Sequence, residues 1–582
     1  MNVLHLYTES PTFLCMCTAI TVLASCVLLC AFKRQQALGP PTHSNPWVDF
    51  LLRATGLGHV SIFAAPHQHE ILRKWADTYG PIFSLQLGQP TMVISDAQLQ
   101  CSLLKGEFAM PKAKFLTVLD HYVSMGHGNM ITISDERSSM WRSFRKAVAQ
   151  SFSSQALQAA FPVVRSCVEE MVQLWRLAQQ EGRPVDVQSW MQKLLLEMLG
   201  RASYGLELNA LQDEQHEYLT LMHENVRQMA EEVGNPLSSW VAKLLPFLPF
   251  ARRSAERLAR VNGMYEKIYK DIKARGPPAE NDQSLAANLM RVVDYTTGEP
   301  FSEATVKANL AVITQAGFDT TATTLVWALY DIALHPSIQQ RIKEEMAAAG
   351  LLQVEGTPPA RALEWADWNA LPYLNMVLKE SMRVHPVVAG GALRDITQDL
   401  CVGGYHVKKG TLVWLPFYSN FNSRINFSNP EMFDPERWRS LEAPLPNPAS
   451  KATAEENPEK RTNVPPTPWS EVPMDCSVTC AQREGPNKPV QCRIGRYATP
   501  NGHAHAAASL IPFGLGSRSC VGQPLANMEA RVALLIVLSN FWCELAPSMP
   551  SHDEVEASKV QGIVLHSGVQ IMLQLKPHTT AK

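Results

Sequence analysis

One short stretch near the C-terminus constrains this 582-residue chain more than any other. Residues 513–522 read FGLGSRSCVG, so a single cysteine, Cys520, stands among three glycines. Glycine adopts backbone conformations closed to other residues and lets the backbone approach a flat ligand closely. Residues 523–531 predict a helix with Pro524 in its first turn. The positive end of that helix then faces the sulfur, which favours a thiolate that binds a metal.

The loop resembles the haem-binding signature of cytochrome P-450 monooxygenases. The residues that carry the resemblance are Phe513, Gly516, Arg518, Cys520, Gly522, Ala526 and Glu529. It implies that Cys520 is the axial ligand of a haem b iron and that Phe513, Arg518 and Gly522 lie against the haem. A thiolate ligand directs electron density toward bound oxygen and favours O–O cleavage. Without the resemblance, the alternative is a buried cysteine in a glycine-rich turn.

The composition is that of a globular protein. A net charge of -2 offers no electrostatic case for binding nucleic acid. Twelve cysteines in so long a chain, four of them in an apolar N-terminal segment, do not form a secreted disulfide framework. We therefore expect reduced thiols in a domain that faces the cytosol.

The N-terminus predicts a membrane anchor. No charged residue occurs from Ser10 to Phe32, and Lys33 and Arg34 follow. This length spans a bilayer, and the basic pair favours a cytosolic body. We expect a lumenal N-terminus at 1–12, a transmembrane anchor at 13–32 and a proline-containing linker at 33–47, in the endoplasmic reticulum membrane. A cleaved signal peptide is the alternative, but its basic residues precede the apolar region.

The rest of the chain predicts a mainly α fold with a small β region. Residues 79–88 and 91–95 predict two strands of an N-terminal sheet, and 402–414 predict a hairpin of the same sheet. The resemblance implies a cytochrome P-450 fold over 48–438 and 510–582.

A tryptophan and an arginine four residues apart, Trp141 and Arg145, share one face of a predicted helix. The resemblance implies that they bind a haem propionate, together with Arg394 and Arg518. Arginine suits this role because its fork pairs with carboxylates. Taken alone, the pair also fits an ordinary amphipathic helix.

A long apolar helix is predicted from Ser302 to His335, with the sequence AGFDTT at 316–321 in its middle. This sequence resembles the oxygen-binding groove of the family, where Ala316 and Gly317 adjoin the haem. Gly317 favours a kink or bulge that leaves room for dioxygen. The resemblance makes Asp319 and Thr320 the catalytic acid and alcohol that deliver protons. The alternative is that Thr320 only bonds back to a helical carbonyl.

A structural network is predicted from Glu380 and Arg383, which share a helix face, and from Arg437 downstream. They resemble the ExxR element of the family and its arginine partner. The family usually has Phe where this chain has Trp438. Removal of one partner would leave a buried charge without its counterion.

Two further stretches suggest contact with apolar molecules. Small and β-branched residues at 387–392 occupy the position of a substrate-contact strand, which suits a bulky substrate such as a sterol. The apolar, proline-broken stretch 240–250 fits a loop that dips into the membrane. The end of a core helix is the alternative for that loop.

Residues 439–509 depart from the family. They contain eleven prolines and predict a largely disordered insertion. Their spacing matches no known zinc pattern, although the insertion contains potential ligands, namely Cys476, Cys480, Cys492, His503 and His505.

The predicted activity is insertion of one atom of O2 into an apolar substrate, a sterol or another lipid. The resemblance implies electrons from NADPH through a flavoprotein reductase, the NADPH-cytochrome P-450 reductase, and cytochrome b5 and membrane lipid as further partners. A basic cluster of Arg142, Arg145 and Lys146 is a predicted contact for the reductase. Two other functions remain open, a haem-thiolate isomerase or dehydratase and a non-catalytic haem-binding protein.

Overall fold

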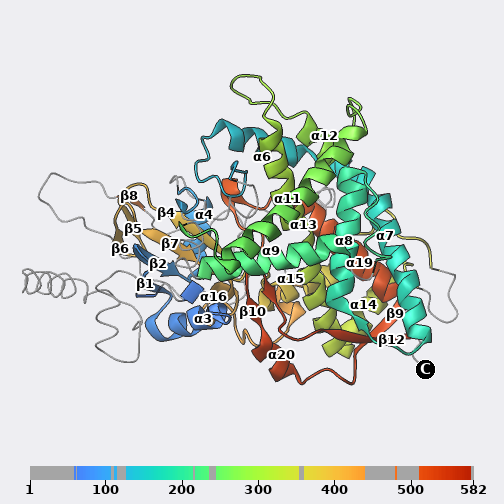
Figure 1. Ribbon diagram of the computed structural model, residues 1–582. Helices are drawn as coiled ribbons and strands as arrows, with labels where there is room; N and C mark the ends of the chain where they lie inside the picture. The colour runs from blue at the N-terminus through green and yellow to red at the C-terminus, as the bar shows by residue number, and fades with distance from the viewer. Residues whose placement is uncertain are drawn as a thin grey trace, which may run out of the picture.

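The computed structural model describes residues 58–59, 62–63, 65–105, 110–114, 126–213, 216–234, 244–352, 360–439, 479–480 and 510–577. These residues form a mainly helical fold with small sheets, as predicted. Figure 1 shows most strands gathered on one side of the molecule and the long helices on the other.

The described residues form fourteen α-helices. The α-helices are α3 (Gln68–Tyr79), α4 (Ala97–Lys105), α6 (Ser139–Gln150), α7 (Ser154–Gln180), α8 (Val187–Met198), α9 (Glu217–Gly234), α11 (Pro249–Ala274), α12 (Leu285–Met290), α13 (Glu303–Leu334), α14 (Pro336–Ala348), α15 (Pro372–Val384), α16 (Phe417–Phe421), α19 (Gln523–Asn540) and α20 (His552–Ser558). A π-helix, η3 (Leu199–Tyr204), and two 3-10 helices, η4 (Pro435–Trp438) and η6 (Gly516–Arg518), complete the described helices.

The sheets are small, and one joins distant parts of the chain. It has the order β1 (Ile82–Gln86), β2 (Pro90–Ile94), β7 (Leu412–Leu415), β4 (Ala392–Asp395). The others are β3 (Val185–Asp186), β12 (Met572–Pro577), β9 (Phe541–Leu545); β10 (Val560–Gln561), β11 (Leu565–His566); and β6 (Tyr405–Val407), β5 (Leu400–Val402), β8 (Thr479–Cys480). The predicted hairpin at 402–414 is thus wrong in one respect, because β5 and β6 form a separate sheet and only β7 joins β1 and β2.

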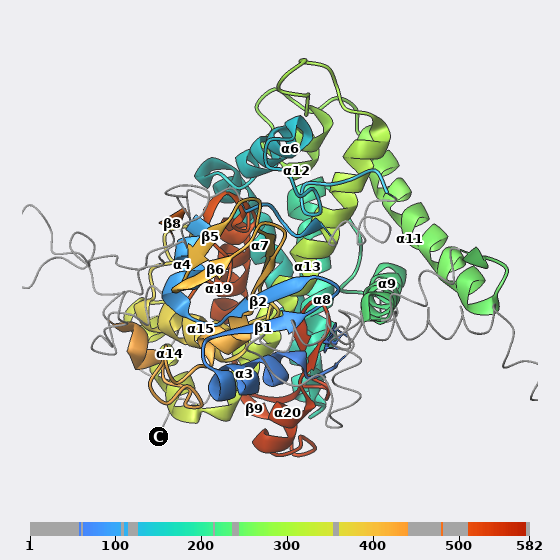
Figure 2. The ribbon, with the colours of Figure 1, turned by 90° about the vertical axis from the view of Figure 1, so that its left-hand side faces the viewer.

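Helix α13 runs through the core, within one residue of the range predicted from the sequence. The Ser302 side chain caps its N-terminus by accepting a hydrogen bond from Thr305 N, and Pro336 follows its end. Residues around its whole circumference are buried, as expected for an apolar helix enclosed by others. It packs against α8, α15 and α19 (Figure 2).

The predicted anchor at 13–32 and linker at 33–47 lie outside the described residues. Among the residues that are described, no helix combines the length and hydropathy needed to cross a bilayer.

Most of the predicted insertion at 439–509 also lies outside the described residues. Its described part, β8, pairs antiparallel with β5, where Thr479 faces Cys401. Cys401 is disulfide-bonded, so the expectation of reduced thiols is wrong at this position. Cys167, Cys520 and Cys543 carry free thiols.

Candidate active site

The cysteine loop is a tight turn that holds Cys520 at the start of α19. Cys520 N donates to Phe513 O at 2.8 Å. Gly514 and Gly516 have φ angles of 68° and 74°, and a Cβ on Gly516 would lie 2.0 Å from Leu104 O. Both glycines are required by conformation, and Gly516 is required by space as well. Gly522 is not, because its φ is -81°, contrary to the expectation for all three.

The surroundings of the Cys520 sulfur have opposing effects on its pKa. Burial raises the pKa of this thiol, while the backbone N–H groups of Gly522 and Gln523 and the charges of Arg145 and Lys112 lower it. The N–H donors come from the first turn of α19, where Pro524 lies as predicted. The protein encloses the thiol, but its surface opens onto a cavity. This is the environment of a metal ligand that becomes a thiolate when the metal binds.

The cavity next to the sulfur has a volume of about 470 Å³. It is bounded by the cysteine loop, α19, α6, α13 and the start of β4. Predicted site residues that line it are Trp141, Arg145, Ala316, Gly317, Thr320, Arg394, Phe513, Arg518, Cys520 and Gly522. Sequence positions up to 381 residues apart are thus brought around one space, as the resemblance implied.

Three of the lining arginines form a cationic rim. Arg145 Nη1 donates to Ser519 O at 2.8 Å, and Arg518 pairs with Glu136 at 3.1 Å while lying over the Trp141 ring. Arg394 is buried, and burial together with Arg518 lowers its pKa to about 10. Among the described residues, the Arg394 guanidinium makes one hydrogen bond, to Leu393 O.

Lys112 is a fourth cation of this rim that sequence reasoning missed. Its Nζ donates to Ile131 O at 2.7 Å. Burial and the neighbouring arginines lower its pKa to about 7. Nothing local in the sequence PKAKF marks it, since the chain brings it to the cavity through an isolated bridge with Arg394.

The rim has more positive than negative charge. Within the described structure, the carboxylates that act on its arginines are Glu136 and Asp135. Buried cations without counterions are costly in a folded protein unless a ligand supplies the anions. The cavity therefore suits an anionic ligand, since Arg145, Arg394, Arg518 and Lys112 could pair with its carboxylates and Cys520 could bind a metal within it.

Helix α13 forms another wall of the cavity, but without the expected bulge. The helix is continuous α-helix from Glu303 to Leu334. Thr320 lines the cavity, and its Oγ1 donates to Ala316 O at 2.8 Å, so the alternative contact foreseen for this hydroxyl is the one that forms. Room beside Thr320 comes from the small side chains at Ala316 and Gly317.

Asp319 is not among the residues that line the cavity. It is nearly buried on another side of α13, where Oδ1 accepts from Gln192 Nε2 at 3.4 Å. The predicted acid and alcohol are therefore adjacent in the sequence but face different surroundings.

The predicted structural network is present, with Glu380 and Arg383 completely buried and the Arg437 side chain 7% exposed. Glu380 accepts hydrogen bonds from Arg383 at 2.8 and 3.0 Å and from Arg437 Nε at 2.9 Å. Asp434 N donates to the same carboxylate at 3.0 Å. Trp438 Nε1 adds a hydrogen bond at 2.9 Å that phenylalanine cannot make. The departure from the family pattern thus strengthens the network.

The predicted substrate-contact strand is shorter than expected. Residues 387–391 form turns, and strand β4 begins at Ala392. Val387, Val388 and Ala392 nevertheless line the cavity. The Cβ of an alanine at 391 would lie 1.9 Å from Leu415 O, so Gly391 allows this close crossing of the chain.

The basic cluster predicted as a reductase contact is divided. Arg145 lies in the cavity wall, while Arg142 bonds Tyr295 Oη at 3.0 Å on the surface.

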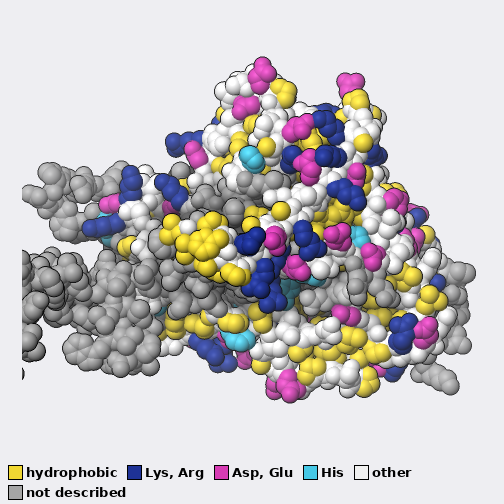
Figure 3. Space-filling model, viewed as in Figure 1, with side chains coloured by type: hydrophobic (Ala, Val, Ile, Leu, Met, Phe, Trp, Pro, Cys, Tyr) yellow, Lys and Arg dark blue, Asp and Glu magenta, His cyan; other side chains and the backbone are white. Residues whose placement is uncertain are grey.

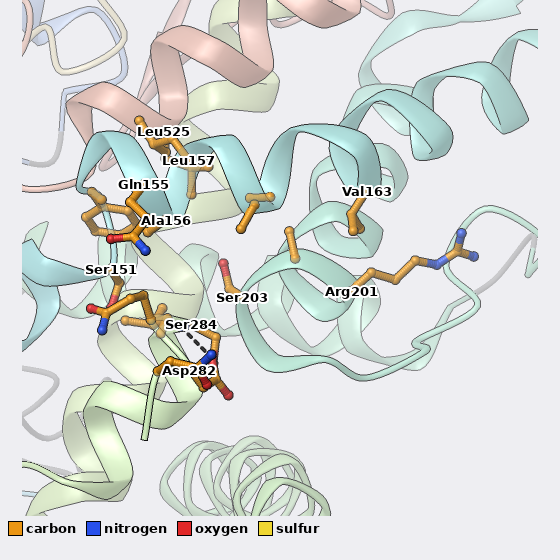
Figure 4. Close-up of a pocket in the computed structure, with 17 residues that line it drawn as sticks. Ser151, Gln155, Ala156, Leu157, Val163, Arg201, Ser203, Asp282, Ser284 and Leu525 are labelled. Atoms are coloured by element: carbon orange, nitrogen blue, oxygen red, sulfur yellow. Dashed lines mark hydrogen bonds between the residues drawn. The ribbon is translucent and has the colours of Figure 1, made fainter. Parts of the chain in front are cut away.

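A second hollow of about 330 Å³ lies between α7, η3 and α12. Figure 4 shows that it is lined mainly by neutral polar and small side chains, with Arg201 at one end. Phe152, Leu285 and Leu525 line both hollows. No predicted site residue lies in it.

Comparison with known proteins agrees with this fold and site. The family model described as Cytochrome P450 matches residues 53–452 and 487–572. The chain is 25% identical to cytochrome P450 27C1 of Danio rerio over 82% of this chain and 78% of the relative. It is also 25% identical to the mitochondrial 25-hydroxyvitamin D-1 alpha hydroxylase of Rattus norvegicus, over 81% of this chain and 83% of the relative.

The resemblance extends to an organellar plant protein and to a solved structure. LUTEIN DEFICIENT 5, a chloroplastic protein of Arabidopsis thaliana, is 22% identical over 81% of this chain and 69% of its own length. A crystal structure of a cytochrome P450 superposes with a TM-score of 0.65 at 17% identity, over 88% of this chain and 94% of that one. The fold and the thiol-lined cavity define a haem-binding oxidoreductase. The chain belongs to the cytochrome P450 family, and membership implies a haem iron.

Proposed function

We propose that this protein is a haem-thiolate monooxygenase that inserts one atom of O2 into an apolar lipid. The observation that carries this proposal is the Cys520 thiol in the wall of a cavity whose rim holds four cations. Bound haem would supply the activation of dioxygen, with the second oxygen atom leaving as water. Cys520 would hold the iron, and Arg145, Arg394, Arg518 and Lys112 would hold the propionates.

The side chains of the protein would leave space for dioxygen, deliver protons and exclude water. Ala316 and Gly317 leave space where dioxygen would lie, because neither carries a bulky side chain. The Thr320 hydroxyl is within the cavity and can exchange its bond to Ala316 O for one to a reacting oxygen. Asp319 would supply the acid once its side chain turns from Gln192 toward the cavity, because it lies on another side of α13. The apolar walls exclude water, which limits loss of reactive oxygen species.

A sterol or another lipid is the proposed substrate class. The cavity wall beside α13 is apolar, with Ile313, Val387, Val388 and Ala392 among its residues. A rigid apolar molecule loses little entropy on entering such a space. One relative is named as a hydroxylase of 25-hydroxyvitamin D, which fits this class.

We also propose NADPH, through a flavoprotein reductase, as the electron source, and cytochrome b5 as an accessory donor. The proposed location is the endoplasmic reticulum membrane, with residues 13–32 as a single-pass anchor and the catalytic domain in the cytosol. Relatives named as mitochondrial or chloroplastic do not favour this location. The uncharged run at 10–32, followed by Lys33 and Arg34, supports it.

Contact between the catalytic domain and the membrane is proposed at the start of α11. Leu244, Leu245, Phe247 and Phe250 are exposed there, Phe247 by 69%. Figure 3 shows hydrophobic side chains over the end of α9 and α11 with Lys and Arg side chains beside them. Such a combination suits the interface of an anionic bilayer.

A spin label at Phe247→Cys is expected to become shielded from a water-soluble relaxation agent when the full chain is reconstituted into vesicles. Ile425 is exposed by 65% and is the control position for Ile425→Cys, expected to stay accessible. Equal accessibility of both labels would contradict the membrane contact.

The activity is tested with isotopically labelled dioxygen and a panel of sterols and fatty acids. With NADPH and the flavoprotein reductase, the product is expected to carry one labelled oxygen atom per molecule. A parallel assay with a ferredoxin and its reductase identifies the electron donor. Conversion of an oxidised lipid without reductant would instead establish the isomerase or dehydratase. Haem loading without turnover of any substrate would favour a non-catalytic haem-binding protein.

A further inference from the structure

Asp319 faces a group of side chains that do not line the cavity. His566 Nε2 lies 3.9 Å from Asp319 Oδ2, and Gln192 donates to Oδ1. The Asp319 side chain is 9% exposed, whereas that of His566 is 27% exposed. The histidine therefore lies between the buried carboxylate and solvent.

The short hairpin that carries His566 is fastened at two points. Leu565 N donates to Val387 O at 2.8 Å, and Trp327 Nε1 of α13 donates to Leu565 O at 2.9 Å. These bonds hold β11 against the cavity wall and α13. The hydrogen bonds of the neighbouring Leu565 backbone thus hold His566 beside Asp319.

The orientation of the imidazole suits donation toward Asp319. Thr323 Oγ1 lies 3.5 Å from His566 Nδ1. A hydroxyl that donates to Nδ1 leaves the proton of the neutral ring on Nε2, the nitrogen that faces Asp319. One bridging water or a small rotation closes the remaining 3.9 Å.

A second histidine, His223 of α9, belongs to the same group. Burial lowers the pKa of His223, Asp319 raises it and His566 lowers it further. The three titratable groups therefore act on one another. The remaining neighbour from α8, Gln192, is neutral.

We propose that His566 passes protons from solvent to Asp319 during oxygen activation. This inference rests on the proposed monooxygenase function. The His566 imidazolium would give its Nε2 proton to the Asp319 carboxylate and keep the proton on Nδ1, which Thr323 Oγ1 then accepts. Asp319 would pass the proton on toward the Thr320 hydroxyl once its side chain turns from Gln192 to the cavity. The imidazole regains a proton from water at its exposed edge. Two such transfers accompany each oxygen atom that leaves as water, and no electrons move along this path.

Histidine suits this task because an unperturbed imidazole gains and loses a proton near neutral pH. A proton path that fails during turnover diverts reducing equivalents into hydrogen peroxide. Removal of the imidazole is therefore expected to raise the ratio of hydrogen peroxide to oxygenated product while leaving haem binding nearly unchanged.

The test compares wild type, His566→Gln and His406→Gln as full-length haem-loaded proteins. His406 is a matched control, because it lies 3.7 Å from Asp399 and is 33% exposed, on β6 and outside the cavity lining. His566→Gln is expected to raise the peroxide fraction several-fold and to enlarge the solvent deuterium isotope effect. His406→Gln should match wild type in both.

A second measurement does not depend on turnover. Histidine resonances in the ferrous carbon monoxide form report the pKa of His223, which is expected to fall further in Asp319→Asn and to rise in His566→Gln. An unchanged peroxide fraction and solvent isotope effect in His566→Gln, with its carbon monoxide band intact, would overturn the proton path. Absence of the thiolate band in wild type would instead overturn the proposed function on which the path rests.

Discussion

Glu380→Gln is expected to yield a protein that retains little haem and unfolds at a much lower urea concentration. The carboxylate is completely buried and accepts hydrogen bonds from Arg383 and Arg437. A neutral amide leaves two buried guanidinium groups without their counterion, and breaking such a pair costs about 3–5 kcal/mol. That is a large part of the roughly 5–15 kcal/mol that stabilises a domain. The ratio of haem to protein and the urea midpoint measure the effect.

The matched comparison is Trp438→Phe, which removes one neutral donor to the same carboxylate. It restores the residue usual in the family, keeps the aromatic packing on Phe427 and leaves both arginines paired. Loss of a hydrogen bond to a charged group costs about 1.5–3 kcal/mol. Similar urea midpoints for Glu380→Gln and Trp438→Phe would contradict the view that the ion pairs hold the region together.

Arg394→Met is expected to speed the release of haem by about 10- to 100-fold, the equivalent of one or two charge-assisted hydrogen bonds. Burial and Arg518 lower the pKa of Arg394 to about 10, so the charge is unfavourable until an anion joins it. The same substitution should therefore stabilise the haem-free protein while weakening the haem complex. Transfer of haem to an excess of apomyoglobin gives the release rate, and urea unfolding gives the stability.

The control for that experiment is Arg424→Met, since the Arg424 side chain is 80% exposed and pairs only with Glu431 among the described residues. We expect this variant to release haem at the wild-type rate. If Arg394→Met destabilised the haem-free protein instead, a structural role for this arginine would replace the role in propionate binding.

Much of the site was predictable because its parts are local patterns. The Cys520 loop, the Trp141 and Arg145 pair and the Glu380 and Arg383 pair each occupy one turn or one helix face, where spacing determines direction. The resemblance to a family then indicated which of these patterns meet in space. The Cys520 loop and the Trp141 and Arg145 pair line the cavity, whereas the Glu380 and Arg383 pair lies outside its lining.

The parts that were missed depend on distant contacts. Lys112 reaches the rim through a bridge to Arg394, and His566 reaches Asp319 through a hairpin held to α13. Neither contact leaves a periodic signal in the sequence. The uninterrupted α-helix of α13 shows a different limit, because glycine permits a bulge without requiring one.

The β region illustrates the same limit. β5 and β6 form a hairpin that turns at Gly403 and Gly404, but pairing within a sheet depends on neighbours elsewhere in the chain. The local sequence therefore predicts where strands form but does not predict which strands pair.

The most direct test of the account is the carbon monoxide difference spectrum of the reduced, haem-loaded protein, with wild type beside Cys520→Ala. A strongly red-shifted band in the wild type that is absent from Cys520→Ala is the predicted result, because only a thiolate ligand produces that shift. A well-folded, haem-loaded wild type without this band would show that Cys520 does not bind the iron as a thiolate, and the proposed monooxygenase activity would be contradicted with it.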